Sequence, residues 1–140
     1  MSLLEPRYVF DTNVIVSALL FQDSVPGRAF AYAQDHGKIL VSTPLLRELQ
    51  SVLGRPKFEA YVTASERNQF LTALTREATL VTVTVELHVV RDPKDNLILE
   101  LAVSGTASAI ITGDADLLAL QVFDSIAIRT PAAFLQLAQP

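Results

Sequence analysis

Cysteine is absent from the 140-residue sequence, so the chain has no disulfide framework and no zinc–thiolate site. Charged residues are sparse, at 19%, whereas half of the residues are apolar, which is typical of a folded globular protein. Basic residues are not in excess, since the net charge is −4. Any nucleic-acid binding must therefore depend on a local site.

Long apolar runs are also missing. No stretch approaches the roughly 20 residues needed to cross a membrane, so we expect no membrane association. The segment "MSLLEPRYVF" has no basic start followed by an apolar region, and we expect no signal peptide and a cytoplasmic protein. A chain of this length suits one domain with its own core, here residues 1–140.

Three common kinds of site find no support in the sequence. The two histidines, His36 and His88, stand apart and form no histidine cluster. No glycine-rich phosphate loop is present, and no Ser-His-Asp set is evident. The carboxylates are the remaining candidates for chemistry.

Short apolar runs alternate along the chain with longer helical patterns. We expect strands at Arg7–Phe10, Lys38–Val41, Leu80–Val85, Ala109–Thr112 and Ser125–Arg129. We expect helices near Val14–Phe21, Gly27–Asp35, Pro44–Leu53, Ala64–Glu77 and Pro93–Ser104, a turn of helix after Asp114 and a last helix over Pro131–Leu137. This order predicts an α/β fold of three layers, α/β/α, with a central parallel sheet of about five strands. The alternating segment "LVTVTV" indicates a half-exposed strand at the edge of the sheet.

Two aspartates follow predicted strands, Asp11 directly and Asp114 after one glycine. Asp11 interrupts the apolar run "YVFDTNVIVSALLF", and Asp114 follows the fourth strand in "IITGDADLL". In a parallel sheet the carboxyl ends of the strands meet at one edge, where ligands bind. Helix capping, worth about 1 kcal/mol, is the alternative explanation. It is weaker for Asp11, because Thr12 and Asn13 are also available as caps.

Two further acids are predicted at the same edge. In "STPLLRELQSVLGRPKF" we expect Thr43 to cap a helix that begins at Pro44, with Glu48 bordering its apolar stripe. In "VVRDPKDNLILELAVSG" we expect Asp92 to cap a helix and Asp95 to face inward from its first turn. A surface glutamate and simple compensation of the helix dipole are the alternatives.

A cluster of these carboxylates would need a compensating cation. Two carboxylates about 4 Å apart repel by about 4 kcal/mol at an effective dielectric constant near 20. Ligands that are all oxygen favour a hard divalent ion, so we expect Mg²⁺ or Mn²⁺.

At these residues the sequence resembles the PIN-domain family of metal-dependent ribonucleases, and more narrowly the VapC-like toxins of bacterial toxin–antitoxin pairs. Three segments carry the resemblance and span nearly the whole chain: "VFDTNVIVSALL", "STPLLRELQSVLGRPKF" and "RDPKDNLILELAVSGTASAIITGDADLLAL". The resemblance implies an endoribonuclease that hydrolyses RNA phosphodiester bonds. The catalytic residues that it implies are Asp11, Glu48, Asp95, Asp114 and Asp116. The metal ligands among them would be Asp11, Asp95, Asp114 and Asp116, with Asn13 and Thr112 as accessory residues.

Substrate and protein partners can also be predicted. The densest basic group, Arg47, Arg55 and Lys57, would contact RNA phosphates together with Arg28, although a solvated helix face is the better explanation of that group. The resemblance implies an antitoxin partner. The apolar helix Val14–Phe21 favours a homodimer, because it offers more apolar surface than one core needs.

Two alternative functions remain open at this point. The first is a catalytically silent PIN-like interaction module, whose acidic pocket is filled by a partner. The second is an Asp-based phosphotransfer domain, which also places an aspartate after its first strand. A hydrolase of that type has a second aspartate where Asn13 stands in this sequence.

Overall fold

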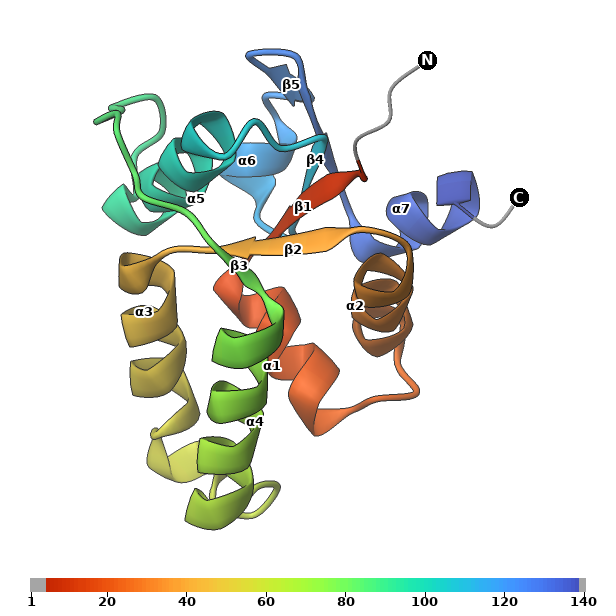
Figure 1. The fold of residues 1–140 in the computed structure, drawn as a ribbon, viewed down its shortest axis with the longest axis vertical. Helices are drawn as coiled ribbons and strands as arrows, with labels where there is room; N and C mark the ends of the chain where they lie inside the picture. The colour runs from red at the N-terminus through yellow and green to blue at the C-terminus, as the bar shows by residue number, and fades with distance from the viewer. Residues whose placement is uncertain (1–4, 139–140) are drawn as a thin grey trace.

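The computed structural model describes residues 5–138, and a mostly parallel sheet of six strands lies at its centre (Figure 1). The strand order is β3-β2-β1-β4-β6-β5. Five strands are parallel, and β5 alone runs antiparallel to its neighbour β6. The strands are β1 (Arg7–Phe10), β2 (Lys38–Val41), β3 (Thr79–Leu80), β4 (Ala109–Ile111), β5 (Val122–Phe123) and β6 (Ile126–Arg129). The predicted α/β fold is confirmed.

Helices cover both faces of the sheet. Helices α5 and α6 pack on one face and α1, α2 and α7 on the other, while α3 and α4 form a pair beside α1 (Figure 1). The helices are α1 (Thr12–Leu20), α2 (Val25–His36), α3 (Thr43–Leu53), α4 (Ala64–Glu77), α5 (Pro93–Ser104), α6 (Ala115–Leu118) and α7 (Pro131–Ala138), with a 3₁₀ turn at Pro56–Phe58. Among residues 5–138, no helix is long and apolar enough to span a membrane.

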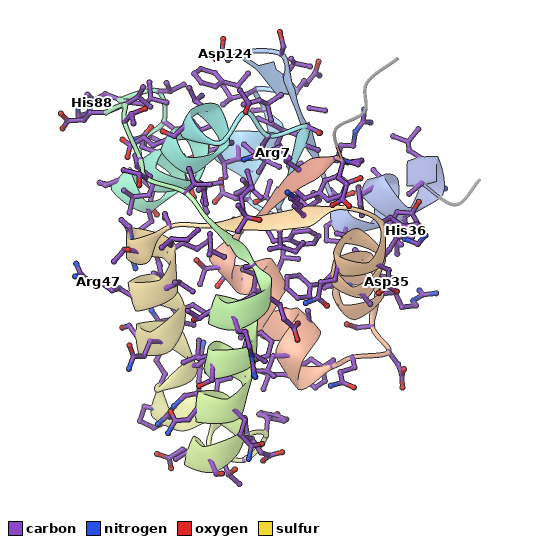
Figure 2. All side chains as sticks on the ribbon, in the orientation of Figure 1. Arg7, Asp35, His36, Arg47, His88 and Asp124 are labelled. Carbon is purple, nitrogen blue, oxygen red and sulfur yellow. The ribbon has the colours of Figure 1, made fainter. Side chains whose placement is uncertain are left out.

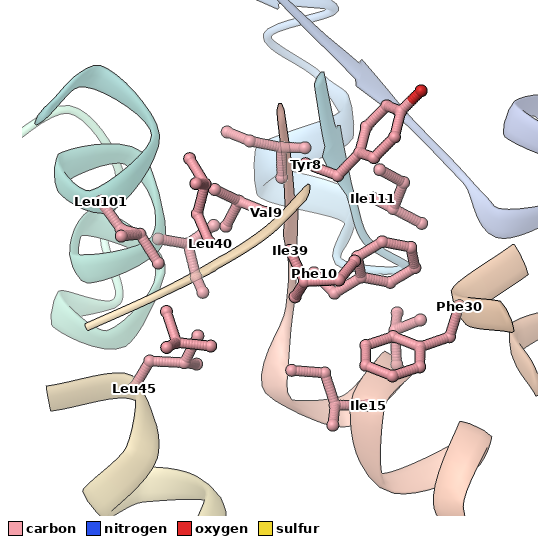
Figure 3. Packing of buried hydrophobic residues seen from close by; sticks show 14 of the residues in the cluster. Tyr8, Val9, Phe10, Ile15, Phe30, Ile39, Leu40, Leu45, Leu101 and Ile111 are labelled. Atoms are coloured by element: carbon pink, nitrogen blue, oxygen red, sulfur yellow. The ribbon is translucent and has the colours of Figure 1, made fainter. Parts of the chain in front are cut away.

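Burial on both faces explains why the central strands are continuously apolar. Side chains of β1 alternate between the two helical layers, because successive residues of a strand point to opposite faces. Phe10 packs edge-to-face on Phe30 of α2, with ring centroids 5.1 Å apart. Figure 3 shows this pair on one side of the sheet and Leu40 with Leu101 on the other. All four side chains belong to one hydrophobic cluster.

Local capping sets the helix boundaries. Ser42 caps α3 by accepting a hydrogen bond from the Leu45 N–H, so the prediction that Thr43 is the cap is wrong by one residue. Asp92 caps α5 as predicted, since its side chain accepts from the Lys94 N–H. Both helices carry proline in the first turn, where a missing N–H costs nothing.

The predicted strand Leu80–Val85 is wrong over most of its length. Strand β3 ends at Leu80, and the chain continues over residues 82–90, called here the strap, without a ladder to another strand. Side chains of α5 accept the strap's N–H groups instead: Ser104 from Thr84, Glu100 from Leu87, and Asn96 from Val89 and Val90. The alternating burial of the strap follows the predicted pattern, but its hydrogen-bond partner is a helix.

Strand β5 was not predicted. It is two residues long and pairs with β6 through a tight turn at Asp124 and Ser125, both of which have positive φ angles. Neither residue is the glycine that usually marks such a turn, so the sequence carries little signal for it.

Candidate metal centre

The site forms where β1 and β4 end side by side. Asp11 follows β1 and Thr112 follows β4, and these two strands are paired in the sheet. The Asp11 N–H continues the pairing by donating to the Ile111 carbonyl at 3.0 Å. Strand β1 leads to β2 on one side and has β4 on its other side, so the site lies at a switch point of the sheet, where open α/β folds bind ligands.

Thr112 connects the two strand ends through its hydroxyl group. Its Oγ1 donates to Asp11 Oδ2 at 2.7 Å and accepts from the Asp114 N–H at 3.0 Å. Thr112 is fully buried. The side chain of Asp11 does not cap α1, although Asp11 holds the N-cap position. The capping alternative therefore does not account for the Asp11 carboxylate.

Asp114 has a double role. Its Oδ1 accepts from the N–H groups of Asp116 and Leu117 and so caps the short helix α6. Both cap bonds use the same oxygen, and this fixes the orientation of the carboxylate. Capping and site formation are therefore compatible at Asp114.

Asp95 is the most unusual of the acids. It projects from the first turn of α5, its exposed fraction is 6%, and within residues 5–138 its Oδ2 is buried with no hydrogen-bond partner. Burial, and then the charges of Asp114 and Asp11, raise the pKa of Asp95 from 3.8 to about 7. A buried carboxylate oxygen without a partner is costly, so Asp95 requires a proton or a cation.

Asp11 shares this environment. Burial is the largest cause that raises its pKa above the ordinary range, and the hydrogen bond from Thr112 opposes that rise. The charges of Asp114 and Glu48 raise the pKa further. These charges belong to residues that are distant in the sequence but line the same cavity.

A cavity of about 200 Å³ brings most of the predicted residues together. Its lining includes Asp11, Asn13, Glu48, Asp95 and Asp114. Glu48 reaches it from the middle of α3, and its Oε1 lies 3.3 Å from Lys94 Nζ of α5. The cavity is thus strongly acidic, with a lysine facing one of its carboxylates.

Asp116 lies beside this cavity. One carboxylate oxygen from each of Asp95, Asp114 and Asp116 falls within 4.8 Å of the others. Both oxygens of Asp116, however, also lie 3.1–3.2 Å from Arg91 Nη2. Asp116 therefore already has a cationic partner, unlike Asp95.

The predicted basic group separates in space. Arg55 lines the cavity, whereas Arg28, Arg47 and Lys57 lie outside its lining. Figure 2 shows Arg47 pointing away from α3 into solvent. The Nζ atom of Lys57 instead lies 5.1 Å from the centroid of the Phe58 ring. The two histidines are at opposite sides of the molecule (Figure 2) and share no site.

Two basic residues at the site were not predicted from the sequence. In "RDPKD", Arg91 directly precedes Asp92 and Lys94 directly precedes Asp95, and each cation pairs with an acid from another part of the chain. Their closeness to Asp95 in the sequence was the available signal. Their partners, Glu48 and Asp116, follow only from the tertiary structure.

Comparison with known proteins agrees with this geometry. The sequence profile described as "PIN domain" matches residues 7–116. The chain belongs to the PIN-domain family. The matched region contains every acid of the site, from Asp11 to Asp116.

Proteins similar to this PIN domain include one that is similar in sequence and two solved structures that are similar in fold. The chain is 29% identical over 123 residues to the uncharacterized protein MJ1680 of Methanocaldococcus jannaschii, covering 86% of this chain and 79% of that protein. VapBC2 from Rickettsia felis, solved bound to a DNA fragment from their promoter, matches with a TM-score of 0.60 at 15% identity, over 89% of this chain and 98% of that chain. PAE2754 from Pyrobaculum aerophilum matches with a TM-score of 0.61 at 16% identity, over 96% and 91% of the two chains.

The residues of this PIN domain fit a hard divalent cation. The donors are carboxylate oxygens, with no sulfur and no imidazole among the lining residues, and Mg²⁺ and Mn²⁺ prefer such ligands. The buried and unpartnered Oδ2 of Asp95 is a donor of the kind that an ion would satisfy.

Proposed function

We propose that this PIN domain is a Mg²⁺- or Mn²⁺-dependent endoribonuclease and the toxin of a toxin–antitoxin pair. The observation that carries the proposal is Asp95: a buried carboxylate with an unpartnered oxygen, set between Asp11 and Asp114 at a switch point of the sheet. Family membership favours this nuclease over the Asp-based phosphotransfer domain.

The roles of the acids follow from their contacts. Asp11, Asp95 and Asp114 would hold the ion, because all three line the cavity and the charges of Asp114 and Asp11 both raise the pKa of Asp95. Glu48 and Asp116 would contribute directly or through water. Thr112 positions Asp11 through its hydrogen bond, and Asn13 would orient a ligand from the first turn of α1.

The reaction would be hydrolysis of an RNA phosphodiester by water. When bound, the ion would lower the pKa of a water molecule and compensate the charge that develops on the phosphate. Water would add to phosphorus and the bond to the 3′ oxygen would break, giving a 5′-phosphate and a 3′-hydroxyl. The protein's own contribution is to fix the acids, and Arg55 at the cavity would contact substrate phosphate.

Protein partners follow from the same proposal. The fold similarity to VapBC2 supports an antitoxin partner, and a positively charged antitoxin side chain would fill the acidic cavity. A homodimer would cover apolar surface such as the mostly apolar cavity of about 300 Å³ between α1, α2 and α4, and sedimentation analysis of the purified chain tests it. With an RNA substrate and an antitoxin partner, the protein would act in the cytoplasm.

An RNA cleavage assay of the wild type and of Asp11→Asn tests the proposed ribonuclease activity. We expect the purified wild type to cleave single-stranded RNA with Mg²⁺ or Mn²⁺ and to stop when EDTA is added. Asp11→Asn should lose the cleavage while keeping its circular dichroism spectrum. Metal-dependent cleavage at the wild-type rate by this variant would refute the assignment. No cleavage by the wild type would favour the silent interaction module.

A further inference from the structure

Lys94 and Glu48 face each other across the acidic cavity. The Nζ of Lys94, on the first turn of α5, lies 3.3 Å from Oε1 of Glu48, on α3. The two side chains differ in exposure: Glu48 is 19% exposed and Lys94 is 59% exposed. The acid is thus on the inner side and the ammonium group is closer to solvent, where a polyanion would approach.

The charge of the cavity explains why this pair matters for RNA. The acids of the lining are Asp11, Glu48, Asp92, Asp95 and Asp114, and the bases are Arg55 and Lys94. An RNA phosphate that approaches this lining is repelled unless a cation is available to contact it. While Lys94 is paired with Glu48, much of its charge is already compensated.

We propose that Lys94 couples ion binding to RNA binding: it neutralises Glu48 in the ion-free protein and contacts an RNA phosphate once a bound ion compensates Glu48. This inference rests on the proposed ribonuclease function and adds to it a residue outside the acidic set. By linkage, the ion then strengthens RNA binding and RNA strengthens ion binding by the same factor.

The other cations near the site do not suit this role. Arg91 and its partner Asp116 lie outside the lining of the cavity. Arg55 lines the cavity but makes no ion pair with any residue in the range 5–138, so an ion would not change its availability. Lys94 alone combines a cavity position with a carboxylate partner that the ion can take over.

Binding of a short single-stranded RNA by fluorescence anisotropy tests the coupling. The RNA is titrated with each protein, once in EDTA and once in Ca²⁺. Ca²⁺ replaces Mg²⁺ so that binding is measured without cleavage, and a gel checks that the RNA remains intact. We expect Ca²⁺ to tighten binding to the wild type. Lys94→Gln should lose about tenfold of the affinity in Ca²⁺ and little in EDTA, because the lost contact is a charge-assisted hydrogen bond.

Four variants separate coupling from net charge. Lys94→Arg keeps the positive charge and should retain the effect of Ca²⁺. Lys38→Gln removes one positive charge from the exposed start of β2, whereas the cavity is at the carboxyl ends of the strands. This variant should therefore change the RNA affinity equally in EDTA and in Ca²⁺. Glu48→Gln should tighten binding in EDTA by freeing Lys94, and most of that gain should vanish in Glu48→Gln/Lys94→Gln.

A second measurement does not involve RNA. Electron paramagnetic resonance of Mn²⁺ should show tighter ion binding to Lys94→Gln than to the wild type, because an ammonium group no longer competes for Glu48. Lys94 is mostly exposed, so this variant should keep the wild-type circular dichroism spectrum.

The outcomes distinguish this inference from the proposed function. If the wild type binds RNA more tightly in Ca²⁺ and Lys94→Gln shows the same gain, the coupling role is overturned and the ribonuclease stands. If the wild type neither binds RNA in Ca²⁺ nor cleaves it with Mg²⁺ or Mn²⁺, both are overturned. Loss of the Ca²⁺ gain in Lys94→Gln, with retention in Lys94→Arg, supports the coupling.

Discussion

The hydroxyl of Thr112 donates a 2.7 Å hydrogen bond to Asp11 although 101 positions separate the two residues in the chain. The same oxygen accepts the N–H of Asp114, so one buried side chain holds two of the proposed ligands in a fixed relation. Groups that orient metal ligands in this way commonly control ion affinity.

Thr112→Val should therefore weaken both the site and the fold. The substitution keeps the shape but leaves Asp11 Oδ2 and the Asp114 N–H without their partner. We expect Mn²⁺ affinity to fall about tenfold and the free energy of unfolding to fall by about 2 kcal/mol. Thr112→Ser keeps the hydroxyl and serves as the control. Wild-type Mn²⁺ affinity in Thr112→Val, measured by titration calorimetry, would show that the hydrogen bond does not position Asp11.

The titration of Asp95 predicts a pH-dependent stability. The folded protein holds this proton up to about pH 7, whereas the ordinary pKa of the group is 3.8. The folded state thus binds more protons in this range, so the free energy of unfolding should fall as pH rises from about 4 to about 7. The raised pKa of Asp11 acts in the same direction.

Asp95→Asn isolates this contribution. In EDTA the free energy of unfolding of this variant should fall much less as pH rises. Above pH 7 the variant should be more stable than the wild type, because it carries no buried charge at position 95. Urea unfolding over a pH series measures the effect, with Asp35→Asn as the control, since Asp35 is exposed on α2 and does not line the cavity. Equal pH slopes in the wild type and Asp95→Asn would contradict the assignment.

The sequence distinguished Asp95 from Asp92 correctly because the signal is local. An aspartate directly before a proline indicates a helix N-cap, and Asp95 lies on the side of the helix that carries the apolar residues Ile98 and Ala102. The structure shows Asp92 as the cap and Asp95 as buried. Asp11 and Asp114 were equally accessible to prediction, since both follow strands of a parallel sheet.

The strap and Lys94 could not be predicted in the same way. Alternation of apolar and polar residues is the same for an edge strand and for an extended segment that packs on a helix. The difference is which group accepts each N–H, and here the acceptors Asn96, Glu100 and Ser104 lie four residues apart on α5. Likewise, the density of basic residues favoured Arg47, whereas Lys94 is at the cavity because α3 and α5 pack together.

Asn96 should contribute most of the hydrogen bonding that holds the strap on α5. Its side chain accepts from the N–H groups of Val89 and Val90 and donates to the Val90 carbonyl. We expect Asn96→Ala to reduce the free energy of unfolding by about 2 kcal/mol, because these groups lose their partner. Ser104→Ala, which removes the single bond to Thr84, should cost about 1 kcal/mol or less.

Hydrogen exchange locates the effect of Asn96→Ala. Loss of protection should be concentrated at residues 89 and 90, while the amides of β1 and β4 keep theirs. Uniform loss of protection across the sheet would mean that Asn96 supports the core and not the strap.

Asp116 and Asp95 should differ in their contribution to ion binding. Asp116 is 38% exposed and already has Arg91 as a partner, whereas Asp95 is buried with an oxygen that has none among residues 5–138. We therefore expect Asp95→Asn to lose about 100-fold or more of the Mn²⁺ affinity and Asp116→Asn about tenfold or less, equivalent to about 2.7 and 1.4 kcal/mol. Arg91→Gln is the matched test, because freeing Asp116 from its guanidinium partner should strengthen Mn²⁺ binding. A calorimetric titration measures both losses. Equal losses of Mn²⁺ affinity for Asp95→Asn and Asp116→Asn would contradict this expectation. They would mean that the ion displaces Arg91 from Asp116 at little cost and that Asp116 binds the ion as strongly as Asp95.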